Sequence, residues 1–181
     1  MLSSDTAQTV SAQTFRRAMS RLPTSITVAA TMIDEEPVGM IIGTFTSISL
    51  DPPIVGFFGD HRSSTFRPLL KTGTLAFSVL QQGARDVCGA FRRVSSERFR
   101  DIEWSLSEQG NPIIPGSALV VEGGVLDVHT VGDHDLVTVL VTAATVPDIA
   151  PRPLVFHDRR LEHLDPTLVS ASSLTFLDWS D

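Results

Sequence analysis

The chain has 181 residues, of which 42% are apolar, and it carries a formal net charge of −7 with a pI near 5.1. This length and apolar content are typical of one folded domain and exclude a disordered chain. The acidic balance argues against binding to nucleic acid or to an anionic membrane surface, but it leaves room for a local anion site. Because Cys88 is the sole cysteine, an intramolecular disulfide is excluded and a cysteine-based zinc site is disfavoured.

The two ends of the chain differ in composition from its middle. Residues 1–11 are polar, lack the basic start and apolar run of a signal peptide, and are expected to be flexible. Residues 165–181 form an expected C-terminal tail, and residues 12–164 an expected single domain. The apolar stretches, such as 136–146, are shorter than the ~18 residues that a membrane span needs. We therefore expect a cytoplasmic protein without membrane contact.

Apolar periodicity predicts the elements in chain order. Phe15, Ala18, Met19 and Leu22 follow helical spacing and predict a helix over 12–21, ended by Pro23. Segments rich in β-branched residues predict strands, and two further apolar patterns predict helices. The predicted strands cover 25–32, 38–45, 54–58, 75–80, 117–131, 136–146 and 153–164, and the helices 66–72 and 84–94.

Six or seven strands with few helices favour a mainly β, antiparallel barrel over a doubly wound sheet. The chain has no Gly-x-Gly-x-x-Gly after a strand, no phosphate-binding P-loop and no Gly-x-Ser-x-Gly elbow. A cofactor would therefore have to be held in another way.

Two polar segments are candidates for ligand binding. In 44–49 (TFTSIS), four hydroxyl side chains crowd the end of an apolar strand and can donate to carbonyl or phosphate oxygens, although an edge strand explains them equally well. In 62–65 (RSST), hydroxyls and a fixed positive charge precede a helix, which suits a phosphate monoester. A plain helix cap is the alternative.

Gly132-Asp133-His134 lies between two predicted strands, where the histidine can bind a substrate amide or serve only in a turn. The histidines show no metal-ligand spacing, so no metal site is expected. Cys88 falls in an amphipathic helical pattern and is expected to be a buried hydrophobe rather than a nucleophile. A basic cluster, Arg92, Arg93, Arg98 and Arg100, is interpreted as salt-bridged surface that can also reach a cofactor phosphate.

Together these segments are similar to the flavin reductase family of FMN-binding split barrels, the reductase components of two-component flavin monooxygenases. The similarity covers roughly residues 12–164 and follows the family's order of motifs. The matching residues are Phe15 to Met19, Pro23-Thr24, Gly39-Met40, Phe45 to Pro53, Ser63-Ser64-Thr65, Arg98-Phe99, Gly132-Asp133-His134 and Pro153-Leu154.

This resemblance implies a split β-barrel oxidoreductase that works as a homodimer. It implies hydride transfer from NAD(P)H to FMN or FAD, without an acid or base residue, and delivery of reduced flavin to a partner monooxygenase. It also implies residue roles: His134 beside the nicotinamide, the phosphate on Ser63, Ser64 and Thr65, and the rest of the flavin along Ile42, Gly43, Thr44, Phe45, Ser47 and Phe91.

The chain departs from the family pattern at six positions. Hydroxyl or amide residues are usual at 41 and 43, glycines at 25 and 139, an asparagine at 78 and a tyrosine at 161; here stand Ile41, Gly43, Ser25, Val139, Ser78 and Leu161. These changes remove hydrogen-bond donors and add side-chain volume near the expected flavin and nicotinamide. A second hypothesis therefore stays open: a flavin-binding or other ligand-binding protein, accessory or repurposed, that keeps the fold without nicotinamide turnover.

Overall fold

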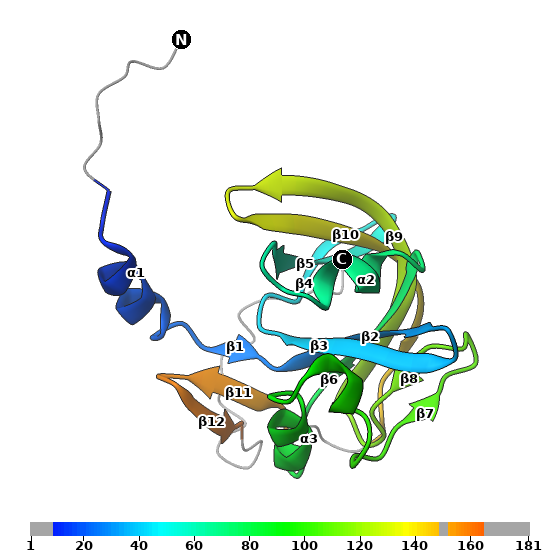
Figure 1. Cartoon of the computed structure of the whole chain (residues 1–181). Helices are drawn as coiled ribbons and strands as arrows, with labels where there is room; N and C mark the ends of the chain where they lie inside the picture. Colours follow the sequence, from blue (N-terminus) through cyan, green and yellow to red (C-terminus); the bar gives the residue numbers. More distant parts are fainter. Residues whose placement is uncertain (1–8, 149–151, 165–181) are drawn as a thin grey trace.

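The computed structural model describes residues 9–148 and 152–164. A seven-stranded antiparallel sheet forms the body, in the strand order β3-β2-β6-β9-β10-β5-β4 (Figure 1). Its strands are β2 (Thr27–Ile33), β3 (Glu36–Ile42), β4 (Thr46–Leu50), β5 (Pro53–Asp60), β6 (Thr74–Val79), β9 (Leu119–Val131) and β10 (His134–Thr145). Because β3 and β4 are edge strands that do not pair, the curled sheet stays open. The predicted mainly β split barrel is confirmed.

Smaller elements surround this sheet. A three-stranded sheet joins β1 (Thr24–Ser25), β11 (Leu154–His157) and β12 (Arg160–His163), and β7 (Ser105–Leu106) pairs with β8 (Pro112–Ile113). The helices are α1 (Ala12–Met19), α2 (Phe66–Leu70), α3 (Arg85–Ala90) and the 3-10 turn η1 (Ser95–Glu97). No helix among the described residues is long and apolar enough to cross a membrane.

Alternation of side chains along β10 fixes which residues face the barrel interior. Asp135, Val137 and Val139 are buried, whereas the residues between them are more exposed. Successive side chains of a strand point to opposite faces, so this pattern places every second residue inside. Val139, expected to narrow the space over the nicotinamide, instead belongs to the barrel core.

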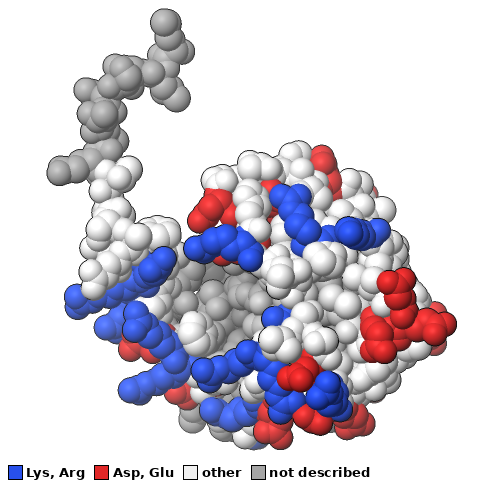
Figure 2. Space-filling view, in the orientation of Figure 1, with Lys and Arg blue, Asp and Glu red and all other residues white. Residues whose placement is uncertain are grey.

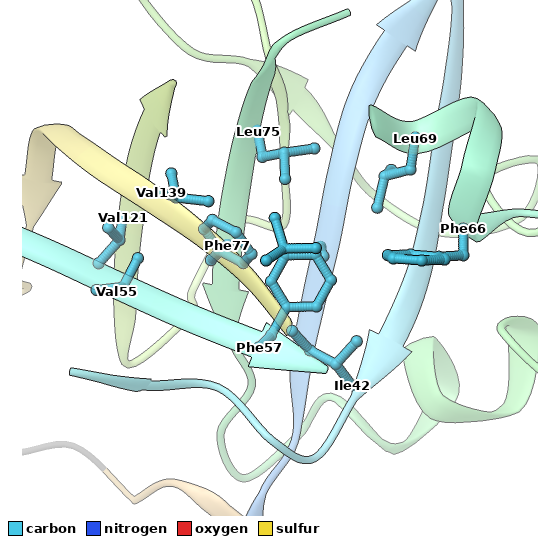
Figure 3. Packing of buried hydrophobic residues seen from close by; sticks show 11 residues of the cluster. Ile42, Val55, Phe57, Phe66, Leu69, Leu75, Phe77, Val121 and Val139 are labelled. Carbon is cyan, nitrogen blue, oxygen red and sulfur yellow. The ribbon is translucent and has the colours of Figure 1, made fainter. Parts of the chain in front are cut away.

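Two clusters of buried residues form the core. The first fills the barrel and is built around Phe57, Phe66, Phe77 and Leu75, whose side chains converge in Figure 3. The second lies between the sheet and the helical segments; it includes Val28, Leu80, Phe91, Phe99 and Leu154. These clusters hold the strands that carry the candidate site.

Three predicted elements differ from the structure. β3 ends at Ile42, not at Phe45, because the chain bends at Gly43; the Phe45 ring then stacks on Phe77 with a centroid distance of 4.8 Å. The last predicted strand is a hairpin, β11–β12, whose turn residues Asp158 and Arg159 have φ angles of 47° and 65°. The helix predicted over 84–94 is shorter and covers α3 alone.

The chain ends lie largely outside the description. Residues 1–8 of the predicted flexible segment and the whole predicted tail, 165–181, fall outside the described residues. The boundaries of a domain over 12–164 stay a prediction. α1 extends away from the barrel and buries none of its side chains (Figure 1).

Candidate functional site

The free edge of β3 and the crossing from β3 to β4 form the framework of the site. After Ile42 the chain turns at Gly43 and passes to the opposite edge of the sheet. Thr44 fixes this crossing, since its Oγ1 accepts a hydrogen bond from the Phe58 backbone N–H at 2.9 Å. The backbone of 43–45 is therefore held next to β5.

The predicted phosphate loop, 63–65, follows β5 and leads into α2. Ser63 Oγ accepts from the Phe66 backbone N–H at 3.3 Å, whereas Thr65, at the N-cap position of α2, makes no capping hydrogen bond with its side chain. Ser64 is exposed and has no hydrogen bond from its side chain to another described residue. Thr65 is buried, with 2% of its surface exposed.

Arg98 brings a positive charge to this loop from a distant part of the sequence. Its Nη1 donates to Thr65 Oγ1 at 3.0 Å and to the Gly39 carbonyl on the β3 edge at 2.8 Å. Within 9–148 and 152–164 it has no carboxylate partner. Burial lowers the pKa of Arg98 from its ordinary value, yet the guanidinium remains cationic at neutral pH.

Arg62, which the sequence suggested as the fixed positive charge of this loop, pairs with Asp60 instead. Arg62 Nη2 lies 2.7 Å from Asp60 Oδ2, and this hydrogen bond holds the pKa of Asp60 well below its usual range. The charge available to an anion therefore comes from Arg98. The Arg98-Phe99 motif was visible in the sequence, but its contact with Thr65 spans 33 positions and could not be read from spacing.

His134 begins β10 and pairs in register with Asp60. Its Nδ1 lies 2.7 Å from Asp133 Oδ1, and this hydrogen bond lowers the pKa of Asp133. Because an ionised carboxylate only accepts, Nδ1 carries the hydrogen, and Nε2 of the neutral ring is left as an acceptor. The side chain is 38% exposed, so Nε2 can reach a ligand.

An apolar pocket of about 530 Å³ opens beside the end of β3. Its apolar wall comes from β3, α3 and the β11–β12 hairpin, and its lining includes Ile41, Ile42, Gly43, Phe91, Phe156 and Leu161. Cys88 also lines it; burial raises the pKa of this thiol, which agrees with a small hydrophobe rather than a nucleophile.

Basic residues form part of the lining of this pocket. Arg92 and Arg159 contribute to it, and neither forms an ion pair within the described part of the chain. Lys and Arg side chains gather around the middle of the face shown in Figure 2, while acidic groups lie mostly nearer its edge. By contrast, Arg93 and Arg100 are salt-bridged, as predicted for the whole basic cluster.

The structure therefore sorts the predicted residues into three sets. Ile42, Gly43 and Phe91 line the apolar pocket, whereas Ser63, Ser64, Thr65 and His134 lie around the loop that follows β5. Along β3 the Arg98 contact at Gly39 lies two residues before Ile41, the first β3 residue of the pocket, which is about 7 Å at ~3.3 Å per residue. Phe45 is half-buried and packs against the barrel core, and Ser47 lies on exposed β4, so neither side chain lines the pocket.

This arrangement suits a flat, apolar ring system that carries a phosphate. The pocket offers apolar walls, and Ser64, Thr65 and Arg98 offer hydroxyl and guanidinium donors to an anion. Of the positions that depart from the family pattern, Ser25, Ile41, Gly43 and Leu161 line the pocket, while Ser78 Oγ accepts a hydrogen bond from the Ile114 backbone N–H at 3.0 Å. No cluster of metal-ligating side chains occurs among the described residues.

Comparison with known proteins identifies the family. Residues 19–165 match the flavin reductase like domain. HsaB, the reductase subunit of a flavin-dependent monooxygenase from Mycobacterium tuberculosis, is 34% identical over 155 residues, covering 85% of this chain and 83% of that protein. Nitrilotriacetate monooxygenase component B from Mycobacterium thermoresistibile has a TM-score of 0.81 and 32% identity, covering 86% of this chain and 87% of that one.

A liganded structure shows the same fold. The Streptomyces globisporus NADH:FAD oxidoreductase SgcE6, in complex with NAD and FAD fragments, has a TM-score of 0.80 and 29% identity, covering 88% of this chain and 98% of that one. Sequence and fold agree over most of the described residues. The chain belongs to the flavin reductase family.

Proposed function

We propose that this protein is an NAD(P)H-dependent flavin reductase that supplies reduced FMN or FAD to a partner monooxygenase. The observation that carries this proposal is the Arg98 guanidinium, which donates to Thr65 and has no carboxylate partner among the described residues, about 7 Å along β3 from an apolar pocket. The named relatives support it, since one is the reductase subunit of a flavin-dependent monooxygenase, one is a component of nitrilotriacetate monooxygenase and one is an NADH:FAD oxidoreductase.

The residues present fit a flavin. The pocket beside Ile42 and Phe91 is wide enough and apolar enough for a ring system, and the separation along β3 is comparable with the reach of a ribityl chain. The backbone of 43–45, fixed by Thr44, offers groups to the polar edge of the ring. Ser64 and Arg98 would hold the phosphate.

A bound flavin would supply the ring that accepts hydride from the reduced nicotinamide. The chain's own residues bind and orient the two partners and exclude water, because hydride transfer between two cofactors needs proximity more than side-chain chemistry. Nε2 of His134, held as an acceptor by Asp133, would take a hydrogen bond from the nicotinamide carboxamide.

The proposed assembly is a homodimer. Large apolar side chains are exposed on α1, on β4 and on the β9–β10 hairpin, among them Phe15, Met19, Ile48, Leu50, Leu126 and Val131. Apolar surface of this extent is typical of contacts between chains. A second copy of the chain can cover this surface, because in a two-fold symmetric dimer the same surface of both chains forms the interface. The single thiol suits the cytoplasm, which we propose as its compartment.

A second candidate function is flavin binding without nicotinamide turnover. Ile41 and Gly43 favour it, because each removes a polar side chain from the expected flavin site. Anaerobic mixing of the purified protein with FMN and NADH separates the two. Bleaching of flavin absorbance well above the rate with free flavin supports the reductase, whereas binding without bleaching by NADH or NADPH leaves the second candidate.

A further inference from the structure

Asp135 is a buried carboxylate that does not line the apolar pocket beside β3. Alternation along β10 turns it inward, and 1% of its surface is exposed. Its Oδ1 accepts from His61 Nε2 at 2.7 Å and from Thr130 Oγ1 at 2.8 Å. Its Oδ2 lies 3.1 Å from Arg67 Nη2.

These partners bracket the predicted phosphate loop. His61 comes just before Ser63–Thr65, and Arg67 comes just after it in α2. The His61 backbone N–H also donates to the Asp133 carbonyl at 3.1 Å. One carboxylate thus links both ends of the loop to β10, by a hydrogen bond to His61 and an ion-pair contact with Arg67.

Burial of this charge needs a reason beyond packing. An ionised carboxylate loses its hydration on burial, and apolar residues of similar size often stabilise a fold as well or better. The side chain of Arg67 is 61% exposed, whereas that of Asp135 is 1% exposed. The contact with Arg67 is an ion pair only, since the buried Asp135 Oδ2 has no hydrogen-bond partner among the described residues.

We propose that Asp135 is a positioning residue that presets the Ser63–Thr65 loop for the phosphate of the flavin. The proposal rests on the proposed function, which places the phosphate at this loop. A loop held in its binding geometry before the ligand arrives loses less entropy on binding. Asp135 therefore acts on phosphate-bearing flavins and leaves the ring site unaffected.

The first test replaces Asp135 with Asn, which keeps the shape of the side chain and removes its charge. For Asp135→Asn we expect the dissociation constant for FMN to rise about tenfold, the size expected for a lost charge-assisted hydrogen bond. The dissociation constant for riboflavin, which lacks the phosphate, stays within about twofold. Fluorescence titration of both ligands measures this difference.

A matched control lies on the same hairpin. Asp127 and His129 form an Asp–His pair at 3.1 Å, with side chains 60% and 59% exposed. Asp127→Asn removes the same charge without touching the loop. It leaves both dissociation constants at their wild-type values.

His61 provides a second pair of variants, which tests the proposal even where Asp135→Asn fails to fold. The His61 side chain is 31% exposed, so replacing it disturbs the core little. His61→Ala removes the bond to Asp135 and reproduces the selective loss of FMN affinity. His61→Gln restores a donor to Asp135 and returns the FMN-to-riboflavin ratio toward the wild-type value.

The contrary results are distinct. Equal changes for FMN and riboflavin in Asp135→Asn and His61→Ala, or no change in either, would overturn the positioning role and leave Asp135 a stabilising residue. Ser64→Ala distinguishes the positioning role of Asp135 from the assignment of the phosphate to the Ser63–Thr65 loop. If Ser64→Ala weakens FMN selectively while the Asp135 variant does not, the positioning role fails and the proposed site stands. If neither is selective, the phosphate assignment falls as well.

Discussion

Hydrogen bonds from neighbouring side chains lower the pKa of three carboxyl groups around the site. Arg62 acts on Asp60, His134 on Asp133, and His61 together with Thr130 on Asp135. A carboxyl with a lower pKa in the folded state stabilises the fold above its ordinary pKa of 3.8. That contribution is lost as the pH falls from there through the folded pKa.

The expected result is a free energy of unfolding that changes little between about pH 7 and 5 and falls below about pH 4. Urea unfolding at each pH measures it. In Asp135→Asn the fall is smaller, because one of the three groups no longer titrates. A variant as acid-sensitive as the wild type would show that Asp135 does not contribute to this dependence.

His134→Ala tests the nicotinamide contact. Removing the Nε2 acceptor raises the KM for NADH about tenfold, the cost of one hydrogen bond to a ligand amide, and leaves the FMN dissociation constant unchanged. Steady-state kinetics with saturating FMN measures the first value, and titration measures the second. An unchanged KM would contradict the nicotinamide contact and would indicate that His134 serves only in the turn between β9 and β10.

For single residues, the sequence predicts which side chains belong to the site better than it predicts what those side chains contact. The hydroxyls at 63–65 and the Gly-Asp-His motif were visible as local patterns, and the structure places both beside the end of β5. Arg98 and Asp135 could not be assigned, because their contacts join residues 33 and 74 positions apart. Phe45 is expected at the flavin, but its ring packs against the barrel core, because the chain passes from β3 to β4 at this point.

At the scale of elements, a glycine sets the distance between β5 and α2. A Cβ built on Gly59 would overlap the ring of Phe66, the first residue of α2, which is fully buried. Gly59→Ala is therefore expected to destabilise the protein by about 1–3 kcal/mol through overpacking. It should also shift α2 and weaken FMN binding.

Gly89 provides the control for this substitution. It lies in α3, and a Cβ there meets no atom within 4 Å. Gly89→Ala should be neutral or stabilise the protein by up to about 1 kcal/mol, since alanine favours a helix over glycine. Thermal unfolding compares the two variants; equal shifts in Tm would contradict the packing of α2 against β5.

The strands of the barrel were predictable because β-branched residues and alternation mark buried sheet surface. Their ends were not, because turn geometry decides them. β3 stops at Ile42 where Gly43 turns the chain, and the last segment folds into β11–β12 around two residues with positive φ. Neither turn carries the Asn-Gly or Asp-Gly pair that marks a hairpin in sequence.

At the scale of the whole molecule, the exposed apolar surface predicts a dimer. The β9–β10 hairpin carries Leu126 and Val131, 54% and 53% exposed, on an arm that projects in Figure 1. Sedimentation should give the mass of two chains. Leu126→Asp with Val131→Asp should shift the protein toward the monomer, because each charge would be buried at the interface.

This test needs a folding control and a clear contrary outcome. Circular dichroism should show the double variant folded, because both side chains lie outside the core clusters. A wild-type protein that sediments as a monomer at micromolar concentration would contradict the proposed homodimer. A double variant that stays dimeric would move the interface to another surface, such as α1.

The measurement that tests the site most directly compares FMN and riboflavin binding in Arg98→Met, with exposed, salt-bridged Arg100→Met as the control. Arg98→Met should weaken FMN tenfold or more, the cost of about 1.5–3 kcal/mol for a hydrogen bond to a charged group, and leave riboflavin unchanged. Arg100→Met should alter neither. Equal loss of both ligands, or none, would contradict a flavin phosphate held by Arg98 beside Thr65.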